Sequence, residues 1–219
     1  MKIQRFYRHL LGIPLLLATL YDGGAQELKK QPAADDGNVS YRGGMVSPPL
    51  PKPKFTLTDT SNSQFDFALK TQGSAVLLFF GYTYCPDMCP MQMHMIAQAL
   101  KTLPPAIASQ FKVVFVTTDP DRDTPQVLRG YLDHFDKNFI GLTGSQSAVD
   151  AAQIAAKIPP AKKSAARPGG AYDVGHASFV LAYTKDNLAH VIYPVGVNEE
   201  DFAHDLRLLV NETWASHAP

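Results

Sequence analysis

Residues 75–90 read Ala-Val-Leu-Leu-Phe-Phe-Gly-Tyr-Thr-Tyr-Cys-Pro-Asp-Met-Cys-Pro, and this stretch decides the fold class. Its first six residues are an unbroken apolar run, which is typical of a β-strand buried on both faces of a sheet. Pro90, at the end of the stretch, suits the first turn of a helix. An apolar helical stripe follows at Met93, Ile96, Ala97 and Leu100. A buried strand that leads directly into an amphipathic helix predicts an α/β fold.

The alternation of strands and helices continues outward from this stretch. A hairpin is expected before it, over 55–58 and 64–67, because both segments alternate apolar and polar residues. After it, the patterns predict a strand at 113–116, a helix over 125–135 capped by Thr124, a helix over 146–157, a loop over 159–175, strands at 179–183 and 190–195, and a helix over 199–214. This order predicts a central mixed sheet flanked by helices, with an N-terminal hairpin extension.

Length and charge limit the classes of protein that this chain can be. With 219 residues, of which 45% are hydrophobic, it can fill one sizeable core. Lys plus Arg and Asp plus Glu number 20 each, and this balance argues against a nucleic acid partner. No run of basic residues indicates a polybasic membrane patch. We expect a monomer with one folded domain.

The first 25 residues have the pattern of a targeting segment. Three basic residues precede an apolar run over 10–20, and Gly23 and Ala25 are small residues suited to a signal peptidase. The run is about half of the roughly 20 residues that span a bilayer, which favours a cleaved signal peptide over a marginal membrane anchor. We therefore expect export to the periplasm or cell envelope, with membrane anchoring as the alternative.

Residues 26–54 are rich in proline, glycine and polar residues, and few of them could form a buried apolar face. Such a composition predicts a Pro-rich linker that is either disordered or wrapped along the domain in an extended form. The folded domain is expected to span residues 55–214.

The two cysteines of the chain, Cys85 and Cys89, both lie between the buried strand and the helix. A disulfide between them would close a very short loop and stabilise the fold little. Cys89 is expected at about the N-cap of the helix, where the helix dipole lowers the pKa of a thiol. Two thiolates so close together can bind a soft ion, and sulfur ligands favour Cu(I), whereas zinc usually takes four ligands. The pair is therefore expected to be chemically active.

Three motifs resemble the Sco/SenC copper chaperones of cytochrome oxidase assembly. The first is Cys85-x-x-x-Cys89-Pro90 after an aromatic-Gly-aromatic strand end. The second is Thr-Asp-Pro-Asp-Arg-Asp-Thr-Pro at 118–125, and the third is Tyr-Asp-Val-Gly-His-Ala-Ser-Phe at 172–179. Together they extend the resemblance over roughly residues 55–210. It implies a thioredoxin-like fold for the copper-binding domain.

The resemblance also implies a metal site and a recipient. Copper, as Cu(I) or Cu(II), would be held by Cys85, Cys89 and His176. It would be delivered to the binuclear copper site of cytochrome c oxidase subunit II or to another envelope cuproprotein, from a donor that the sequence does not identify. In one departure, Gly175 stands where an acidic residue commonly precedes the histidine.

His176 is also singled out by its position in the predicted chain order. It ends a Gly-containing loop just before a strand, near the place where thioredoxin-like enzymes have a cis-proline that faces the cysteine pair. Here Ala177 and Ser178 follow instead. An imidazole in this place would complete a three-coordinate site, and imidazole also suits Cu(II).

Several nearby residues have both a functional and a structural interpretation. Asp87, between the cysteines, either tunes the thiolate charge and contacts a partner or is a turn or capping residue. Asp119, after the second buried strand, either orients a metal ligand or forms an Asp-Pro turn. Arg122 and Asp123 are expected to pair with each other near the following helix cap. A stripe of thioethers either relays Cu(I) or is ordinary packing; it consists of Met88, Met91 and Met95.

Two enzymatic functions are alternatives to a metallochaperone. A thiol-disulfide reductase acting on envelope or oxidase-subunit cysteines would use Cys85 and Cys89 as attacking and resolving thiols. Against it, the usual motif has two residues between the cysteines, and the proline that would face them is missing. A peroxide-reducing enzyme would need an arginine beside the thiolate, and the sequence shows none locally. We therefore predict a copper carrier rather than an enzyme.

Overall fold

The computed structural model describes residues 40–167, 169–211 and 214. The strands are β1 Gly44–Pro51, β2 Thr56–Asp59, β3 Gln64–Asp66, β4 Ala75–Gly81, β5 Phe111–Thr117, β6 Ile140–Thr143, β7 Lys162–Lys163, β8 Val174–Gly175, β9 Val180–Tyr183 and β10 Leu188–Tyr193. The helices are α1 Phe67–Lys70, α2 Met88–Thr102, α3 Pro105–Ala108, α4 Pro125–Asp133, α5 Gln146–Ala155 and α6 Glu199–Asn211. The predicted signal peptide at 1–25 and the first part of the predicted linker lie outside the described residues.

A mixed sheet of eight strands forms the centre of the fold, in the order β1-β10-β9-β4-β5-β6-β2-β3. β4, β5 and β6 are parallel to one another, and the remaining neighbours pair antiparallel. All seven residues of β4 are buried, as its unbroken apolar run predicts. The predicted mixed sheet is confirmed, and the predicted N-terminal hairpin is β2–β3, which joins the sheet through β6.

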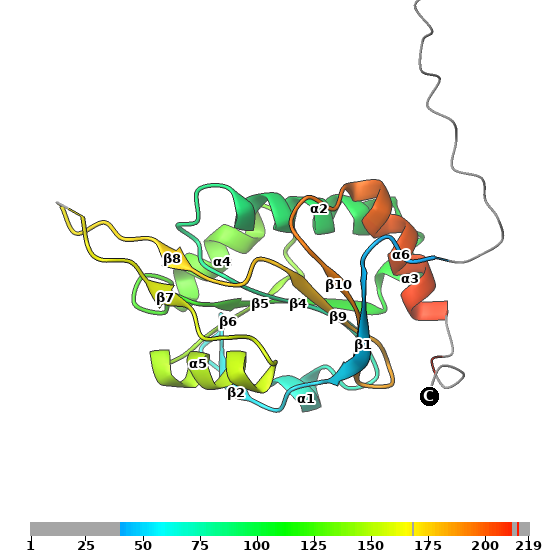
Figure 1. The fold of residues 1–219 in the computed structure, drawn as a ribbon, viewed down its shortest axis with the longest axis horizontal. Coiled ribbons are helices and arrows are strands. Elements are labelled where there is room, and N and C mark those ends of the chain that lie inside the picture. The colour runs from blue at the N-terminus through cyan, green and yellow to red at the C-terminus, as the bar shows by residue number, and fades with distance from the viewer. Residues whose placement is uncertain (1–39, 168, 212–213, 215–219) are drawn as a thin grey trace, which may run out of the picture. The chain divides into compact units, whose positions relative to one another are not determined.

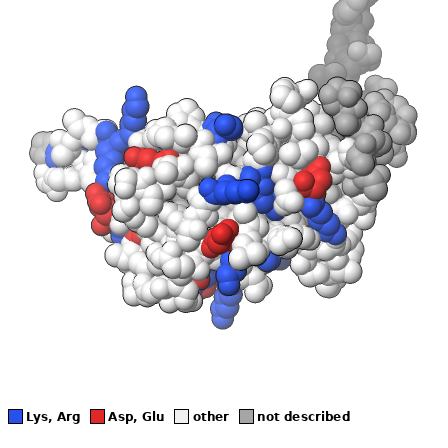
Figure 2. Space-filling view, turned by 90° about the horizontal axis from the view of Figure 1, so that it is seen from below, with Lys and Arg blue, Asp and Glu red and all other residues white. Residues whose placement is uncertain are grey.

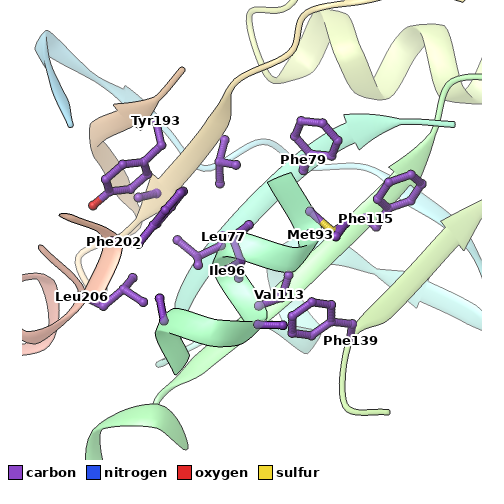
Figure 3. Packing of buried hydrophobic residues seen from close by; sticks show 14 of the residues in the cluster. Leu77, Phe79, Met93, Ile96, Val113, Phe115, Phe139, Tyr193, Phe202 and Leu206 are labelled. Atoms are coloured by element: carbon purple, nitrogen blue, oxygen red, sulfur yellow. The ribbon is translucent and has the colours of Figure 1, made fainter. Parts of the chain in front are cut away.

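Helices cover both faces of this sheet (Figure 1). On one face α2, α4 and α6 enclose a core that contains Met93, Ile96 and Phe202. Figure 3 shows Met93 beside Phe79 and Phe115 of the sheet, and Phe202 beside Tyr193. On the other face α1 and α5 pack over a second apolar cluster. Because both faces of β4 are packed, the carboxyl end of that strand is held firmly in place, and the cysteine motif begins there.

The segment that the composition assigned to a linker includes an edge strand. β1 pairs antiparallel with β10, and the backbone N–H groups of Arg42 and Gly43 donate to the buried carboxylate of Asp205 at 3.0 and 2.8 Å. An edge strand tolerates prolines because only one of its sides needs hydrogen-bond donors. The predicted domain start at Phe55 is therefore too late, and the extended form is correct for 44–51.

Other differences concern short elements. β6 was not predicted, because four residues that include Gly141 carry too little periodicity. The predicted loop over 159–175 contains the two-residue strands β7 and β8, which pair as a hairpin that projects beyond the main sheet (Figure 1). We call residues 159–176 the arm. The single-turn helices α1 and α3 were also missed. α6 is described as far as Asn211, and residues 212–213 of the predicted helix lie outside the described residues.

The surface on the α1 and α5 side carries charges of both signs. Figure 2 shows Lys and Arg side chains on this face with Asp and Glu side chains between them. The mixture follows from the balanced composition and gives this face no field of a single sign. None of the helices in the described part of the chain combines the length and hydropathy needed to cross a bilayer.

Candidate metal centre

The cysteine motif occupies the turn from β4 into α2. β4 ends at Gly81, and α2 begins at Met88 with Asp87 as its N-cap. Cys89 is therefore the second residue of the helix, two positions after the N-cap instead of at the predicted N-cap, and is fully buried. Cys85 lies in the loop before the helix and is half-buried. Both cysteines are reduced, so the pair is free to react or to bind an ion.

The arm brings His176 to the cysteine pair. Nε2 of His176 lies 3.4 Å from Sγ of Cys89, and the backbone N–H of Cys89 lies 3.4 Å from Sγ of Cys85. One ligand atom from each of the three residues lies within 4.8 Å of the other two. The predicted convergence of two sulfurs and one imidazole, from segments about ninety residues apart, is thus present in the fold.

Hydrogen bonding and packing set the orientation of the imidazole. Nδ1 of His176 lies 2.9 Å from the carbonyl oxygen of Ala177, and since a carbonyl only accepts, Nδ1 carries the proton. Nε2 then presents its lone pair toward the sulfurs, as a ligand atom must. The ring packs edge-on against Tyr82 and Phe79, with centroids 5.6 and 6.1 Å apart. The imidazole is therefore held in the orientation that metal binding requires.

Two of the three candidate ligands, Cys85 and His176, line an open hollow of about 270 Å³. It is lined by Tyr82, Cys85, Pro86, Asp87, Met88, Val174, Gly175, His176 and Ser178. Cys85 and His176 are partly accessible there, whereas Cys89 is fully buried and does not line the hollow. A partner protein could thus reach two of the three donor atoms.

The two thiols have opposite acidities. Hydrogen bonds to the Cys85 sulfur from the Cys89 thiol and from the backbone N–H groups of Asp87 and Cys89 outweigh its burial and lower the pKa of Cys85 to about 4. The pKa of Cys89 is raised, because its thiol donates to the Cys85 thiolate and is buried. In the metal-free protein Cys85 therefore carries the charge and Cys89 the proton.

This division predicts selective alkylation of Cys85. The thiolate of Cys85 is fully formed above its pKa of about 4, so its rate with iodoacetamide is expected to change little between pH 6 and 8. An ordinary thiol gains nearly tenfold per pH unit in this range. Mass spectrometry of the reduced protein follows the modification, and protein unfolded in urea is the control, in which both cysteines regain the ordinary dependence. A steep rise for Cys85 in the folded protein would contradict the assignment.

Gly81 allows Cys89 to pack against the end of β4. A Cβ atom at position 81 would lie 2.9 Å from Sγ of Cys89, 2.7 Å from the Phe79 ring and 3.1 Å from the Phe115 ring. These neighbours are fully buried, so none of them can move away easily.

We expect Gly81→Ala to destabilise the protein by about 1–3 kcal/mol, the usual cost of overpacking a core, and to displace the Cys89 sulfur. Urea denaturation measures the loss. Gly130→Ala in α4 is the matched control, because a Cβ there meets nothing within 4 Å and alanine favours a helix by up to about 1 kcal/mol. If Gly81→Ala and Gly130→Ala changed the free energy of unfolding equally, the space beside Cys89 would be large enough for a Cβ atom, and the prediction would be wrong.

The hydrogen bonds of Asp119 go to residues other than the three candidate ligands. Its buried carboxylate pairs with the Arg122 guanidinium and accepts from the Tyr172 hydroxyl at 2.8 Å, and Lys163 of the arm lies 3.4 Å away. The predicted pairing of Arg122 with Asp123 is therefore wrong, since Arg122 pairs with Asp119. Asp119 fastens the arm instead of orienting a ligand directly.

Arg122 joins the arm to the cysteine loop. Its guanidinium lies 3.8 Å from the Tyr172 ring centroid and 4.8 Å from that of Tyr84, and it donates to the Tyr172 carbonyl at 3.3 Å. Tyr84 precedes Cys85, and Tyr172 lies four residues before His176. The group of Asp119, Arg122, Tyr84 and Tyr172, here named the arginine clamp, connects the two segments that carry the sulfurs and the imidazole.

Asp123 has a separate role that the sequence did not reveal. Its buried carboxylate accepts from the backbone N–H of Thr83 at 2.9 Å, from the Thr83 hydroxyl at 2.6 Å and from the Thr117 hydroxyl at 2.7 Å. These bonds anchor the start of the cysteine loop to the end of β5. The Asp-Thr-Pro motif signalled a helix cap, which Thr124 does provide, but the partner of the aspartate depends on tertiary contacts.

The remaining predicted residues surround the hollow. Asp87 is exposed and makes no capping bond with its side chain, so the capping role is not observed. Gly175 is exposed at the end of β8 and pairs with Lys162. Met88 lines the hollow, whereas Met91 and Met95 continue along α2.

Comparison with known protein families finds one family whose model matches most of the described chain. The family model described as SCO1/SenC matches residues 46–211. This chain belongs to the SCO1/SenC family. The match begins inside β1 and includes the cysteine motif, the Asp-Pro motif and the histidine segment. The resemblance noted on three short motifs is thereby confirmed over most of the described chain.

Individual SCO1/SenC proteins are similar in sequence and in structure. "Protein SCO1 homolog 2, mitochondrial" of Arabidopsis thaliana is 39% identical over 115 residues, which cover 51% of this chain but only 38% of that relative. The apo Sco1 structure from Thermus thermophilus is 31% identical with a TM-score of 0.70, covering 78% of this chain and 98% of the other. Copper-bound ScoI of Bradyrhizobium japonicum is 28% identical with a TM-score of 0.65, covering 74% and 99%. The thioredoxin-like fold is confirmed.

The donor set of this SCO1/SenC chain fits copper. Two sulfurs suit Cu(I), and the imidazole extends the site to Cu(II). Within the described residues the group of His, Cys, Asp and Glu side chains close enough to share an ion consists of Cys85, Cys89 and His176. A structural zinc site usually has four protein ligands.

Proposed function

We propose that this protein is a metallochaperone that carries copper on Cys85, Cys89 and His176 and passes it to a cuproprotein. The observation that carries the proposal is the meeting of two sulfurs and one imidazole nitrogen within 4.8 Å of one another, with Cys85 and His176 lining an open hollow. Copper-bound ScoI of Bradyrhizobium japonicum supports it, since that relative shares the fold.

Partial exposure of the site suits a carrier. A partner that approaches the hollow meets Cys85 and His176 first, so its own thiols or imidazoles can replace them one at a time while Cys89 retains the ion. Each exchange keeps copper coordinated. The Cys85 thiolate, with a pKa of about 4, is ready to bind without first losing a proton.

The recipient that we propose is cytochrome c oxidase subunit II, whose binuclear copper site the family resemblance implies. The basic and apolar start of the chain supports a location in the periplasm or cell envelope. Mass analysis of protein taken from that compartment tests the location, with a mature chain expected to begin at Gln26. Transfer is tested by mixing copper-loaded protein with the apo copper domain of subunit II and measuring the copper content of each after separation.

Copper titration of the reduced protein tests the carrier function itself. We expect a tight equivalent of Cu(I) and of Cu(II), and His176→Ala should abolish Cu(II) binding and weaken Cu(I) by more than about 10-fold. His134→Ala is the matched control, because His134 is exposed at the end of α4. Unchanged copper binding in His176→Ala would overturn the proposal.

A thiol-disulfide reductase is the second candidate, favoured by the low pKa of the accessible Cys85 beside the protonated Cys89. An insulin-reduction assay separates the two functions. A reductase should be indifferent to His176→Ala and should be inhibited by copper, whereas a carrier should show little turnover in either form.

A further inference from the structure

A stripe of thioethers follows the surface of α2 away from the cysteine pair. Met88, Met91 and Met95 lie at i, i+3 and i+7 and therefore share one face of the helix. Met88 is 36% exposed, and Met91 and Met95 are half-buried, whereas Met93 is fully buried in the core. Met95 also packs against the core, yet all three thioethers of this row keep part of their surface exposed, although methionine is usually an interior residue.

An imidazole lies beside this stripe. His94 is exposed on α2, three residues after Met91, and Met95 is four residues after Met91. His94 and Met95 each lie one turn from Met91, with Cβ atoms about 5–6 Å from that of Met91, so their side chains flank Met91 and can reach one ion beside its sulfur. The segment thus presents two thioethers and one imidazole on one turn of helix surface.

The stripe connects two hollows. Met88 lines the hollow that contains Cys85 and His176. Met95 lines a second hollow of about 470 Å³, together with Asn198, Glu199 and Glu200 at the start of α6. Met88 and Met95 are separated by about 10 Å along the helix axis. The carboxylates of the second hollow attract cations to the outer end of the stripe.

We propose that Met91, His94 and Met95 form a second Cu(I) site on α2, with Met88 between it and the cysteine pair. Thioether sulfur is soft and selects Cu(I) over harder ions. Because thioethers are neutral, this site holds Cu(I) more weakly than two thiolates do. This difference in Cu(I) affinity favours movement of the ion from the outer site toward Cys85 and Cys89.

Movement along the stripe is ligand exchange and changes no oxidation state. Met88 replaces a donor of the outer site, the Cys85 thiolate then replaces Met88, and Cys89 releases its proton to water as its sulfur binds. The existence of the outer site is independent of the proposed carrier function, but this inward transfer rests on it.

Methyl NMR of protein labelled at the methionine methyl groups tests the outer site under anaerobic, reducing conditions. Cu(I) is added in steps. The first equivalent is expected at the cysteine pair, and the second should shift the methyl signals of Met91 and Met95. Two methionines are internal controls, since Met45 is 58% exposed on β1 and Met93 is buried in the core. A shift of Met45 equal to that of Met91 would show nonspecific thioether binding and overturn the proposal.

Variants distinguish failure of the outer site from failure of the cysteine site. Met91→Leu with Met95→Leu preserves side-chain volume and is expected to reduce Cu(I) stoichiometry from two to one. Met45→Leu should leave it at two. If the cysteine site fails instead, the methyl shifts should appear with the first equivalent. Unchanged stoichiometry in the double variant contradicts the outer site.

The same double variant tests inward transfer. In stopped-flow measurements with Cu(I) supplied by a weak chelator, we expect loading of the cysteine pair to be several-fold slower, with the same end point. An unchanged loading rate would show that copper reaches Cys85 and Cys89 directly from solution.

Discussion

Replacing Cys85 with serine is expected to reduce Cu(I) affinity by more than about 100-fold. Residues that merely orient a metal ligand are typically worth 10–100-fold in metal affinity, and in the proposed site Cys85 would supply a ligand atom itself. A hydroxyl is also a poor ligand for a soft ion. Competition with a colorimetric Cu(I) chelator measures the change. Cys85 is the better cysteine to replace, because it is half-buried, whereas Cys89 is fully buried and its replacement would also disturb the core.

Asp87→Asn is the matched control for this experiment. Asp87 lines the same hollow, but its side chain is exposed and makes no capping bond, and its backbone N–H to Cys85 is retained. We expect Cu(I) affinity to stay within a few-fold of the original. A large loss in Asp87→Asn would restore the prediction that this carboxylate tunes the thiolates. Retention of tight binding in Cys85→Ser would exclude the three-ligand site.

Loss of the arginine clamp is expected to affect both stability and copper binding. Arg122→Ala removes the main partner of the fully buried Asp119 carboxylate and the cation stacked on Tyr172. Leaving a buried acceptor without its partner costs about 1–3 kcal/mol. The arm would also lose its link to the cysteine loop, so we expect Cu(II) affinity to fall by about 10-fold through misplacement of His176. Urea denaturation measures the loss of stability, and a Cu(II) titration measures the loss of Cu(II) affinity.

Two other variants separate charge from geometry in the clamp. Arg122→Lys keeps the positive charge but lacks the planar group that stacks on the tyrosines, and we expect it to restore stability more than Cu(II) affinity. Arg129→Ala removes an arginine whose pair with Asp133 is exposed, and Cu(II) affinity should not change. If Arg122→Ala weakens folding but leaves Cu(II) affinity intact, the clamp does not position His176.

Local sequence patterns predicted the cysteine half of the site well. The run over 75–80 is apolar at every position, which only a strand buried on both faces explains, and Pro90 marks the helix that follows. These signals depend on neighbouring residues, so the turn that carries Cys85 and Cys89 could be placed before any tertiary contact was known.

The other half depends on contacts that local patterns do not encode. His176 lies on a hairpin with two-residue strands, and its assignment came from the family resemblance. The choice of Asp119 rather than Asp123 as the partner of Arg122 is decided by Tyr172, about fifty residues away. β1 was missed for a similar reason, because its prolines look like a linker until β10 supplies the neighbouring strand.

The separation of the copper ligands along the chain has a thermodynamic consequence. Two of the candidate ligands are at positions 85 and 89 and the third is at position 176. They therefore meet only after the sheet has formed and the arm has packed against the cysteine loop. An ion that binds this arrangement, but not the unfolded chain, adds its binding free energy to the stability of the fold, about 2.7 kcal/mol when free ligand exceeds the dissociation constant 100-fold. The copper-loaded protein should therefore survive heat and proteases that destroy the empty one, and under the proposed carrier function the transfer of copper to a partner would return the protein to its less stable form.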